Sequence, residues 1–342
     1  MTTSAASSTG TPDTTDSPDA PSSDTTARRG PGWLPWAALG VVYLVWGSTY
    51  LGIRFTITSM PALLSAGLRF LLAGVLLTVI VLVFSGPSAL RMSLPEFGTA
   101  ALGGVLLPAL GNGIVVIAQF QVASGLAALL VACVPLYVVV LRRASGERPP
   151  WITFAGVGLG LAGLAVLLLG GSSSAGTHGS AWWGPWLVLL AAAFWATGSF
   201  ATTKLPVPAN PFALSAVQMV VGGVVLSAGG LVSGERIDFA AITPSSWIAW
   251  IYLVTFGSLL AFSSYVYALG TLPVSTVATY AYVNPVIAVV LGVLLAKESF
   301  DLVQLAGGAL VLVAVVLVVR AERRSRRAVI TESSPVEGTV SG

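Results

Sequence analysis

The feature that most constrains this chain is a series of ten apolar stretches, each of about 17 to 24 residues, between residues 33 and 320. A helix of that length crosses the hydrocarbon core of a bilayer, which is about 30 Å thick. Only 8% of the residues are charged, against roughly 25% in an ordinary soluble protein, so the composition excludes a soluble globular domain. We therefore predict an all-α integral membrane protein. Its ten transmembrane helices are expected near residues 36–55, 62–84, 97–119, 122–141, 151–170, 184–203, 211–232, 247–269, 273–295 and 301–320.

The distribution of basic residues predicts the orientation of these helices. With the N-terminus in the cytoplasm, the outer loops carry only Arg236 and Lys297, and most other Lys and Arg residues fall in the inner loops. Basic loops favour the cytoplasmic side of a membrane, so both termini are expected there. The Ser- and Thr-rich segment 1–32 is predicted to be a disordered cytoplasmic tail, 171–183 an extracytoplasmic loop, and 321–342 a basic cytoplasmic tail.

The chain also carries an internal repeat of about 150 residues. Two five-helix repeats follow from it, at residues 33–170 and 184–320. Because five is an odd number, the second repeat must cross the membrane in the opposite sense, and such inverted repeats suit alternating access. The matched positions, at spacings of 149 to 151 residues, are Trp46 with Trp195, Pro61 with Pro211, Pro135 with Pro285, and Glu147 with Glu298.

Two of the matched residues, Pro135 and Pro285, lie inside the predicted fourth and ninth helices. A proline in a helix interior removes one backbone hydrogen bond and loosens the helix. We therefore predict helix bends at both prolines, beside a cavity. A tolerated kink without a role in gating is the alternative.

Five short segments carry a resemblance to a known family. They are Val45-Trp-Gly-Ser-Thr-Tyr, Ala66-Gly-Leu-Arg-Phe-Leu-Leu-Ala-Gly, Gly111-Asn-Gly, Val134-Pro-Leu and Tyr280-Ala-Tyr-Val-Asn-Pro-Val-Ile-Ala-Val-Val-Leu-Gly-Val-Leu. In this order, and with the duplication, they make residues 36–320 similar to the EamA-type family of the drug/metabolite transporter superfamily, in particular its YedA-like branch. The resemblance implies ten helices, cytoplasmic termini, and a central cavity lined mainly by helices 1, 3, 4, 6, 8 and 9. It also implies export of amino acids, related metabolites or drugs.

One segment departs from the pattern of that branch. Where its members commonly carry an acidic residue in the third helix, this chain reads Ala118-Gln119-Phe120-Gln121. The departure puts any cation-binding or proton-coupling role of that acid in question for this chain.

Arg69 lies eight residues into the predicted second helix, and a guanidinium keeps its charge even when buried. A charge at this depth usually faces a cavity or a partner. Arg69 is therefore a candidate site for a substrate carboxylate. The alternatives are a structural clamp on backbone carbonyls at the cavity wall and extension of the side chain to the membrane interface.

Neutral amides and aromatic rings complete the predicted substrate site. Asn112 and Gln119 belong to the third helix, and Asn284 directly precedes Pro285. Amides beside Gly or Pro gather polar groups near the membrane midplane, where transporter sites are built, although interhelical hydrogen bonding explains each one singly. Six aromatic residues are candidates for a wall against flat or cationic solutes, with core packing as the alternative: Trp46, Tyr50, Trp195, Tyr265, Tyr280 and Tyr282.

Several kinds of chemistry find no support in the sequence. The predicted helices contain no Asp or Glu away from their ends, and the single histidine, His178, falls in the predicted outer loop. The sequence therefore does not support a proton relay. No phosphate-binding motif and no Cys/His cluster occurs. We therefore predict no enzyme, no catalytic residue, no metal, no cofactor and no nucleic-acid partner. The Gly156-x-x-x-Gly160 pair favours close helix packing and suggests a homodimer face.

These observations together predict a secondary transporter of a bacterial inner membrane, with a small organic solute and the lipid bilayer as its partners. It is expected to export the solute by alternating access. The alternatives are an importer of a sugar or other metabolite, a non-transporting membrane scaffold or sensor, and a membrane-embedded enzyme. Fold and repeat predict how such a protein moves a solute, and leave the identity of the solute open.

Overall fold

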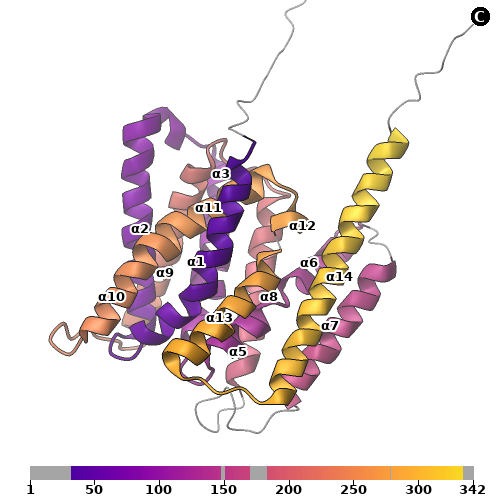
Figure 1. Ribbon diagram of the computed structural model, residues 1–342. Helices are drawn as coiled ribbons and strands as arrows, with labels where there is room; N and C mark the ends of the chain where they lie inside the picture. Colours follow the sequence, from indigo (N-terminus) through magenta and orange to yellow (C-terminus); the bar gives the residue numbers. More distant parts are fainter. Residues whose placement is uncertain (1–31, 148–150, 170–182, 278, 334–342) are drawn as a thin grey trace, which may run out of the picture. The chain divides into compact units, whose positions relative to one another are not determined.

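The computed structural model describes residues 32–147, 151–169, 183–277 and 279–333. These residues form helices and connecting loops, and no β-strand occurs among them (Figure 1). The predicted all-α fold is therefore confirmed, whereas the predicted tail 1–32 and loop 171–183 fall almost wholly outside the described residues. The elements are α1 Leu34–Thr56, α2 Ala62–Ser85, the 3₁₀-helix η1 Pro87–Leu90, α3 Leu94–Gly104, the π-helix η2 Val105–Asn112, α4 Gly113–Ala118, α5 Ser124–Val131, α6 Val134–Ala144, α7 Trp151–Leu169, α8 Gly184–Thr202, α9 Pro211–Val232, α10 Pro244–Tyr252, the π-helix η3 Leu253–Leu260, α11 Ala261–Thr271, α12 Val274–Val277, α13 Tyr280–Ala296 and α14 Leu302–Ser333.

Seven helical segments of the described residues are long and apolar enough to cross a membrane. Three of them are composite, since α3, η2 and α4 form one segment, α5 and α6 another, and α10, η3 and α11 a third. Further apolar helices within α7, α13 and α14 are shorter. The chain is thus a membrane protein with several spans, while the count of ten stays a prediction. The last helix does not end at residue 320 but continues to Ser333.

Side-chain caps explain where several helices begin. Ser93 and Glu96 form a capping box at the start of α3. Asn210 accepts two backbone N–H groups in the first turn of α9, and Thr243 accepts one at the start of α10. These caps satisfy N–H groups that have no partner within the helix, so the local sequence determines these starting points.

Two pairs of helices pack closely along their length: α2 against α9, and α7 against α14 (Figure 1). Glycines permit the approach. A Cβ atom on Gly223 of α9 would lie 2.6 Å from the backbone nitrogen of Leu71 in α2. One on Gly163 of α7 would lie 2.8 Å from the backbone nitrogen of Val311 in α14. Small residues at helix contacts let two backbones come together in a membrane, where packing rather than water drives association.

The Gly156-x-x-x-Gly160 pair is used within the chain. A Cβ atom on Gly156 would lie 2.7 Å from Cγ2 of Val318 in α14, and one on Gly160 would lie 2.5 Å from Cδ1 of Leu136 in α6. The motif therefore serves helix packing inside one subunit. A homodimer stays a prediction, but these two glycines no longer support it.

Two π-helical segments, η2 and η3, interrupt the third and eighth predicted spans. They lie at matching places in the two repeats, since Val105 and Leu253 begin them at a spacing of 148 residues. A π-helix widens the turn and rotates the residues that follow, and such segments concentrate at functional sites. The apolar pattern of the sequence did not predict them.

The fourth and ninth predicted spans differ at their prolines. The fourth is broken at Ala132 and Cys133, and α6 begins at Val134 with Pro135 in its first turn. In the ninth, α13 continues through Pro285, and the helix is interrupted earlier, between α12 and α13. Neighbouring helices and polar side chains can satisfy the groups that a proline frees, so Pro285 does not break its helix. A role in gating stays a prediction for both prolines.

Candidate functional site

The candidate site lies between two clusters of buried apolar side chains. One cluster includes Trp46 and draws on α1, α2, α9, η3, α11 and α13. The other draws mainly on α5, α6, α8 and α14. The ring of Trp195 packs against both clusters and so marks the boundary between them.

A cavity of about 60 Å³ opens at this boundary. A cavity of this size has room for a few water molecules, whereas pockets for drug-sized ligands measure roughly 300 to 1,000 Å³. All six helices that the resemblance implies contribute to its wall, and α2 contributes as well. The lining residues are Trp46, Thr49, Tyr50, Ile53, Arg69, Phe70, Gly111, Asn112, Val115, Val131, Ala191, Ala192, Trp195, Gly257, Phe262 and Tyr280.

Arg69 is the charged residue of the lining, and its side chain is only 4% exposed. Its Nε donates a hydrogen bond to Ser258 Oγ at 2.8 Å, and its guanidinium carbon lies 4.5 Å from the centre of the Phe70 ring. No carboxylate of the described residues pairs with it. Arg69 thus lies inside the bundle rather than extending to the interface, and it brings an uncompensated positive charge to the cavity.

The aromatic wall is built around Trp46. The Trp46 ring meets Trp195 edge to face, with centroids 5.3 Å apart, and meets Tyr280 in the same way at 5.4 Å. The indole Nε1 of Trp46 donates to the backbone carbonyl of Gly257 in η3 at 3.2 Å. This contact joins α1 to the π-helix η3.

Polar atoms without partners face this region. Asn112 Oδ1, Trp195 Nε1 and the Tyr280 hydroxyl are buried and form no hydrogen bond of normal geometry within the described part of the chain. A buried polar atom without a partner is costly unless water or a ligand satisfies it. Together with Arg69, these atoms give the cavity a cation, hydrogen-bond donors and an acceptor.

Three predicted site residues, Tyr265, Gln119 and Asn284, do not line this cavity. Tyr265 is buried behind Trp46, and its hydroxyl bonds to Ser199 Oγ at 2.7 Å. Gln119 is fully buried with an unpartnered amide, outside the lining. Asn284, with its amide turned so that the nitrogen donates, bonds to the carbonyl of Tyr43 in α1 at 3.0 Å. The side chain of Tyr282 lies outside the described residues.

Several lining residues were not among the predicted site residues. Phe70 and Phe262 are ordinary apolar residues of a span, and Gly257 belongs to a π-helix that no sequence pattern indicates. Thr49 bonds its hydroxyl to the carbonyl of Trp46, so its polarity is satisfied locally. The one available signal was proximity, because Thr49 and Phe70 lie beside the predicted residues Tyr50 and Arg69.

One end of the bundle, which carries the loop between α1 and α2, is closed by bonds between the two predicted repeats. We call it the α1–α2 end. Ser246 Oγ donates to the carbonyl of Phe55 at 2.8 Å, and Trp250 Nε1 donates to the carbonyl of Ser65 at 2.8 Å. Glu235 accepts the backbone N–H groups of the first turn of α2. Beyond Arg69 toward this end lies a small void of about 10 Å³, lined by Ile53, Ser65 and Trp250 among others.

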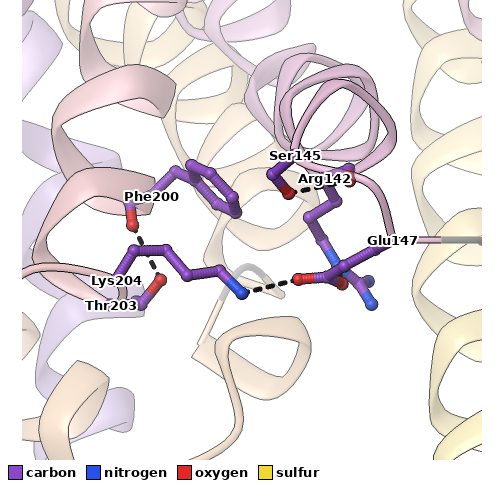
Figure 2. Close-up of polar contacts among 6 residues, drawn as sticks. All are labelled: Arg142, Ser145, Glu147, Phe200, Thr203 and Lys204. Atoms are coloured by element: carbon purple, nitrogen blue, oxygen red, sulfur yellow. Dashed lines mark hydrogen bonds and ion pairs between the residues drawn. The ribbon is translucent and has the colours of Figure 1, made fainter.

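The opposite end carries a different polar cluster. Glu147 lies between two basic residues, 2.7 Å from Lys204 Nζ and 2.6 Å from Arg142 Nε (Figure 2). Burial by itself raises the pKa of the Glu147 carboxyl, but the hydrogen bonds and charges of Lys204 and Arg142 hold that pKa below its ordinary value. Glu147 therefore stays ionised at neutral pH and joins the end of α6 to the end of α8.

A metal site has no basis in the described part of the chain. It contains no group of three or more His, Cys, Asp or Glu residues that could hold an ion. The cavity lining combines aromatic rings, an amide and one guanidinium with aliphatic side chains.

The sequence pattern of the EamA-like transporter family matches residues 33–169 and 182–320. The chain belongs to this family. Its relatives include the "Uncharacterized inner membrane transporter YedA" of Escherichia coli K12, which is 38% identical over 285 residues, 83% of this chain and 90% of YedA. The "Probable terminal-alkyne amino-acid exporter" of Streptantibioticus cattleyicolor is 29% identical over 210 residues, 61% of this chain and 68% of that protein.

A solved structure shares the fold of this EamA-family chain. It is a crystal structure of a protein 20% identical in sequence, with a TM-score of 0.61, over 85% of this chain and 98% of that one. The predicted family resemblance is confirmed. This EamA-family chain is accordingly a membrane transporter rather than an enzyme, and a small-molecule solute and a membrane are its partners.

Proposed function

We propose that this EamA-family chain is a secondary transporter that exports small carboxylate-bearing solutes, such as amino acids and related metabolites, across a bacterial inner membrane. It works by alternating access between two inverted five-helix repeats, at residues 33–170 and 184–320, with both termini in the cytoplasm. The observation that carries the proposal is Arg69, a buried guanidinium at the cavity without a carboxylate partner among the described residues.

The proposed topology is supported by pairs of matching contacts. The second predicted span packs against the seventh, as α2 against α9, and the fifth packs against the tenth, as α7 against α14. The third and eighth spans each carry a π-helix at the same place. A pseudo-two-fold axis in the membrane plane relates such elements in inverted repeats. The family also matches both halves of the chain separately.

The proposed solute class follows from the chemistry of the lining. A carboxylate can form two parallel hydrogen bonds with a guanidinium, which favours Arg69 as its anchor. The acceptor Asn112 Oδ1 suits an ammonium group, and the faces of Trp46 and Trp195 suit an apolar or flat side chain. An α-amino acid offers all three groups, and the similar protein from Streptantibioticus cattleyicolor is named as a probable terminal-alkyne amino-acid exporter.

The test is the solute profile of the external medium, measured by mass spectrometry. Cells that overproduce the wild type are compared with cells that overproduce Arg69→Leu at matched membrane levels. We expect an amino acid or related carboxylate to be enriched outside wild-type cells and to fall by about tenfold or more in the variant, because a charge-assisted bidentate contact is lost. Arg91→Leu, at an exposed arginine outside the helices, is the matched control and should leave export unchanged.

Two outcomes would contradict the proposal. Equal export by wild type and Arg69→Leu would remove Arg69 from the binding site. Depletion of a solute from the medium would indicate import. Failure of Arg69→Leu to reach the membrane would support the clamp instead, and Arg69→Lys, which keeps the charge but not the planar fork, then separates the two roles.

A further inference from the structure

Two glutamates and two basic residues occupy matching positions in the predicted repeats. Glu298 follows Glu147 by 151 residues, and Lys204 follows Arg54 by 150 residues. Each repeat therefore places an acid just after its fourth span and a base at the end of its first span. In inverted repeats, equivalent residues lie at opposite ends of the bundle. Comparing the contacts of these residues therefore shows whether the two ends of the bundle have the same conformation.

Glu298 bridges two spans at the α1–α2 end. Its carboxylate accepts hydrogen bonds from Ser124 N and Ser124 Oγ, both at 2.8 Å, and from Gly125 N at 3.1 Å. These bonds tie the segment after α13 to the start of α5, which means the ninth predicted span to the fourth. The basic residue at this end, Arg54, donates instead to the carbonyl of Gln119 at 3.2 Å.

Glu147 makes a different set of contacts at the opposite end. Its two oxygens accept from Lys204 Nζ and Arg142 Nε, and so the carboxylate is held at the ends of α8 and α6 (Figure 2). The acid and base are paired here, whereas at the α1–α2 end the matching acid binds backbone N–H groups. The two ends of the bundle are therefore in different states.

Helix packing agrees with this difference. The outer half of the fourth span, α5, packs against α13, and a Cβ atom on Gly125 would lie 3.1 Å from the Cα of Val289. The other half, α6, packs mainly against α8, and α13 is not among its main neighbours in the described residues. The break at Ala132 and Cys133 separates the two halves, so each can pack independently.

We propose that Glu298 and Glu147 are alternating latches of the transport cycle. In this conformation Glu298 holds the fourth and ninth spans together at the α1–α2 end, while Glu147 is held aside by Lys204. In the opposite conformation Glu298 releases α5 and pairs with Arg54, and Glu147 leaves Lys204 and bridges the fourth span to the ninth at its own end. The inference rests on the proposed alternating access between inverted repeats.

The exchange keeps the two conformations close in free energy. In each of them one carboxylate accepts backbone N–H groups and the other forms an ion pair, so the kinds of bond are conserved while their places change. A carrier needs such a balance, since a solute can shift an equilibrium only by its differential affinity for the two states.

The test measures from which face the cavity can be reached. A cysteine is introduced at the cavity residue Ala192 in a Cys133→Ala background, and a membrane-impermeant thiol reagent is added to sealed vesicles of either orientation. We expect Glu298→Gln to raise the labelling rate from the α1–α2 face relative to the other face about tenfold, because bonds that exist in only one state are weakened. Glu147→Gln should change the ratio in the opposite direction.

Three further variants sharpen the test. Glu96→Gln is the matched control, since Glu96 caps only its own helix, and it should leave the ratio unchanged. Lys204→Gln and Arg54→Gln remove the bases that hold the latches aside, and should give smaller shifts, Lys204→Gln toward the α1–α2 face and Arg54→Gln away from it. They also cover the case in which a glutamate variant does not fold.

Equal changes of the labelling ratio in both glutamate variants, or no change in either, would contradict the proposed latches. A lower melting temperature of Glu298→Gln without a face-specific change would also overturn them, because it would mark a structural cap. Labelling requires no solute, so this result is independent of the export assay. The labelling test can contradict the latches even if the export assay demonstrates export. The export assay can likewise give a negative result even if the labelling test supports the latches.

Discussion

The interface between α2 and α9 and the cavity beside Trp46 show two opposite uses of the space between helices. At the interface no room remains: a Cβ atom on Gly67 would lie 2.6 Å from the backbone nitrogen of Ser227, and one on Gly223 would lie 2.8 Å from the carbonyl of Gly67. At the cavity about 60 Å³ stays open, and buried polar atoms lack partners. Packing density stabilises the first region, whereas the second keeps polar groups available for a solute.

The difference between the interface and the cavity arises because lipid, rather than water, is the solvent around the helices. Between helices in lipid, dispersion contacts and close backbone approach supply most of the association energy, so glycines that admit a neighbouring backbone are stabilising. A cavity forfeits those contacts. Its aromatic rings restore part of them through edge-to-face packing around Trp46. Variants at the interface should therefore change stability, and variants at the cavity should change it less.

The largest effect is expected at the interface. Gly223→Val would force Cβ against the backbone of α2 at Leu71 and Gly67, and backbone atoms cannot move aside as a side chain can. We expect a loss of about 3 kcal/mol or more in the free energy of unfolding, with little protein in the membrane. Membrane yield and the melting temperature in detergent measure the effect.

The control for this variant is Gly158→Ala in α7. An added Cβ there has no neighbour within 4 Å, so yield and melting temperature should match the wild type. If Gly223→Val melts like Gly158→Ala, the close approach of α2 and α9 does not contribute to stability as argued.

A smaller effect should separate the two tryptophans of the cavity. Trp46→Phe removes the donor to the carbonyl of Gly257, whereas Trp195→Phe removes an indole N–H that forms no hydrogen bond of normal geometry in the described part of the chain. Leaving a buried acceptor unsatisfied costs about 1 to 3 kcal/mol, so Trp46→Phe should be the less stable of the two by about that amount. Thermal denaturation of both proteins under the same conditions measures the difference, and equal stability would remove the bond to η3 as a cause.

The smallest effect is expected on acidification, at the rim of the bundle. The pKa of Glu147 is held below its ordinary value of about 4.3, so its ion pairs contribute stability above that pH. The contribution is lost as the pH falls through the lowered pKa. Because Glu147 is 30% exposed, we expect less than about 1 kcal/mol. Melting curves between pH 6 and pH 3 should show this loss in the wild type and not in Glu147→Gln.

The place of Arg69 illustrates what the sequence could predict. A guanidinium cannot lose its charge. An apolar transmembrane helix that contains an arginine must therefore direct that side chain toward the polar groups of the bundle interior. The structure places Arg69 at the cavity, with Trp46, Tyr50, Asn112, Trp195 and Tyr280 around it. For these residues, residue type and depth in a span were sufficient information.

Gln119 and Asn284 illustrate what it could not predict. Both are amides within predicted spans, yet neither lines the cavity, and Asn284 instead binds the backbone of α1. Which way such a side chain faces depends on the rotation of its helix. The π-helix η2 changes that rotation before Gln119, and α13, which carries Asn284, begins only at Tyr280; neither feature follows from an apolar pattern with a period of 3.6 residues.

The sequence by itself determined that this chain belongs in a bilayer, that it folds into apolar helices, and that a charge must be buried in the second of them. Those properties follow from hydropathy, helix length and the cost of exposing a guanidinium to lipid. Only the tertiary structure decided which residues meet at the cavity and which end of the bundle is closed. The reason is that Glu298 and Glu147 each follow the fourth span of their repeat, but packing of distant segments brings Glu298 to Ser124 and Glu147 to Lys204.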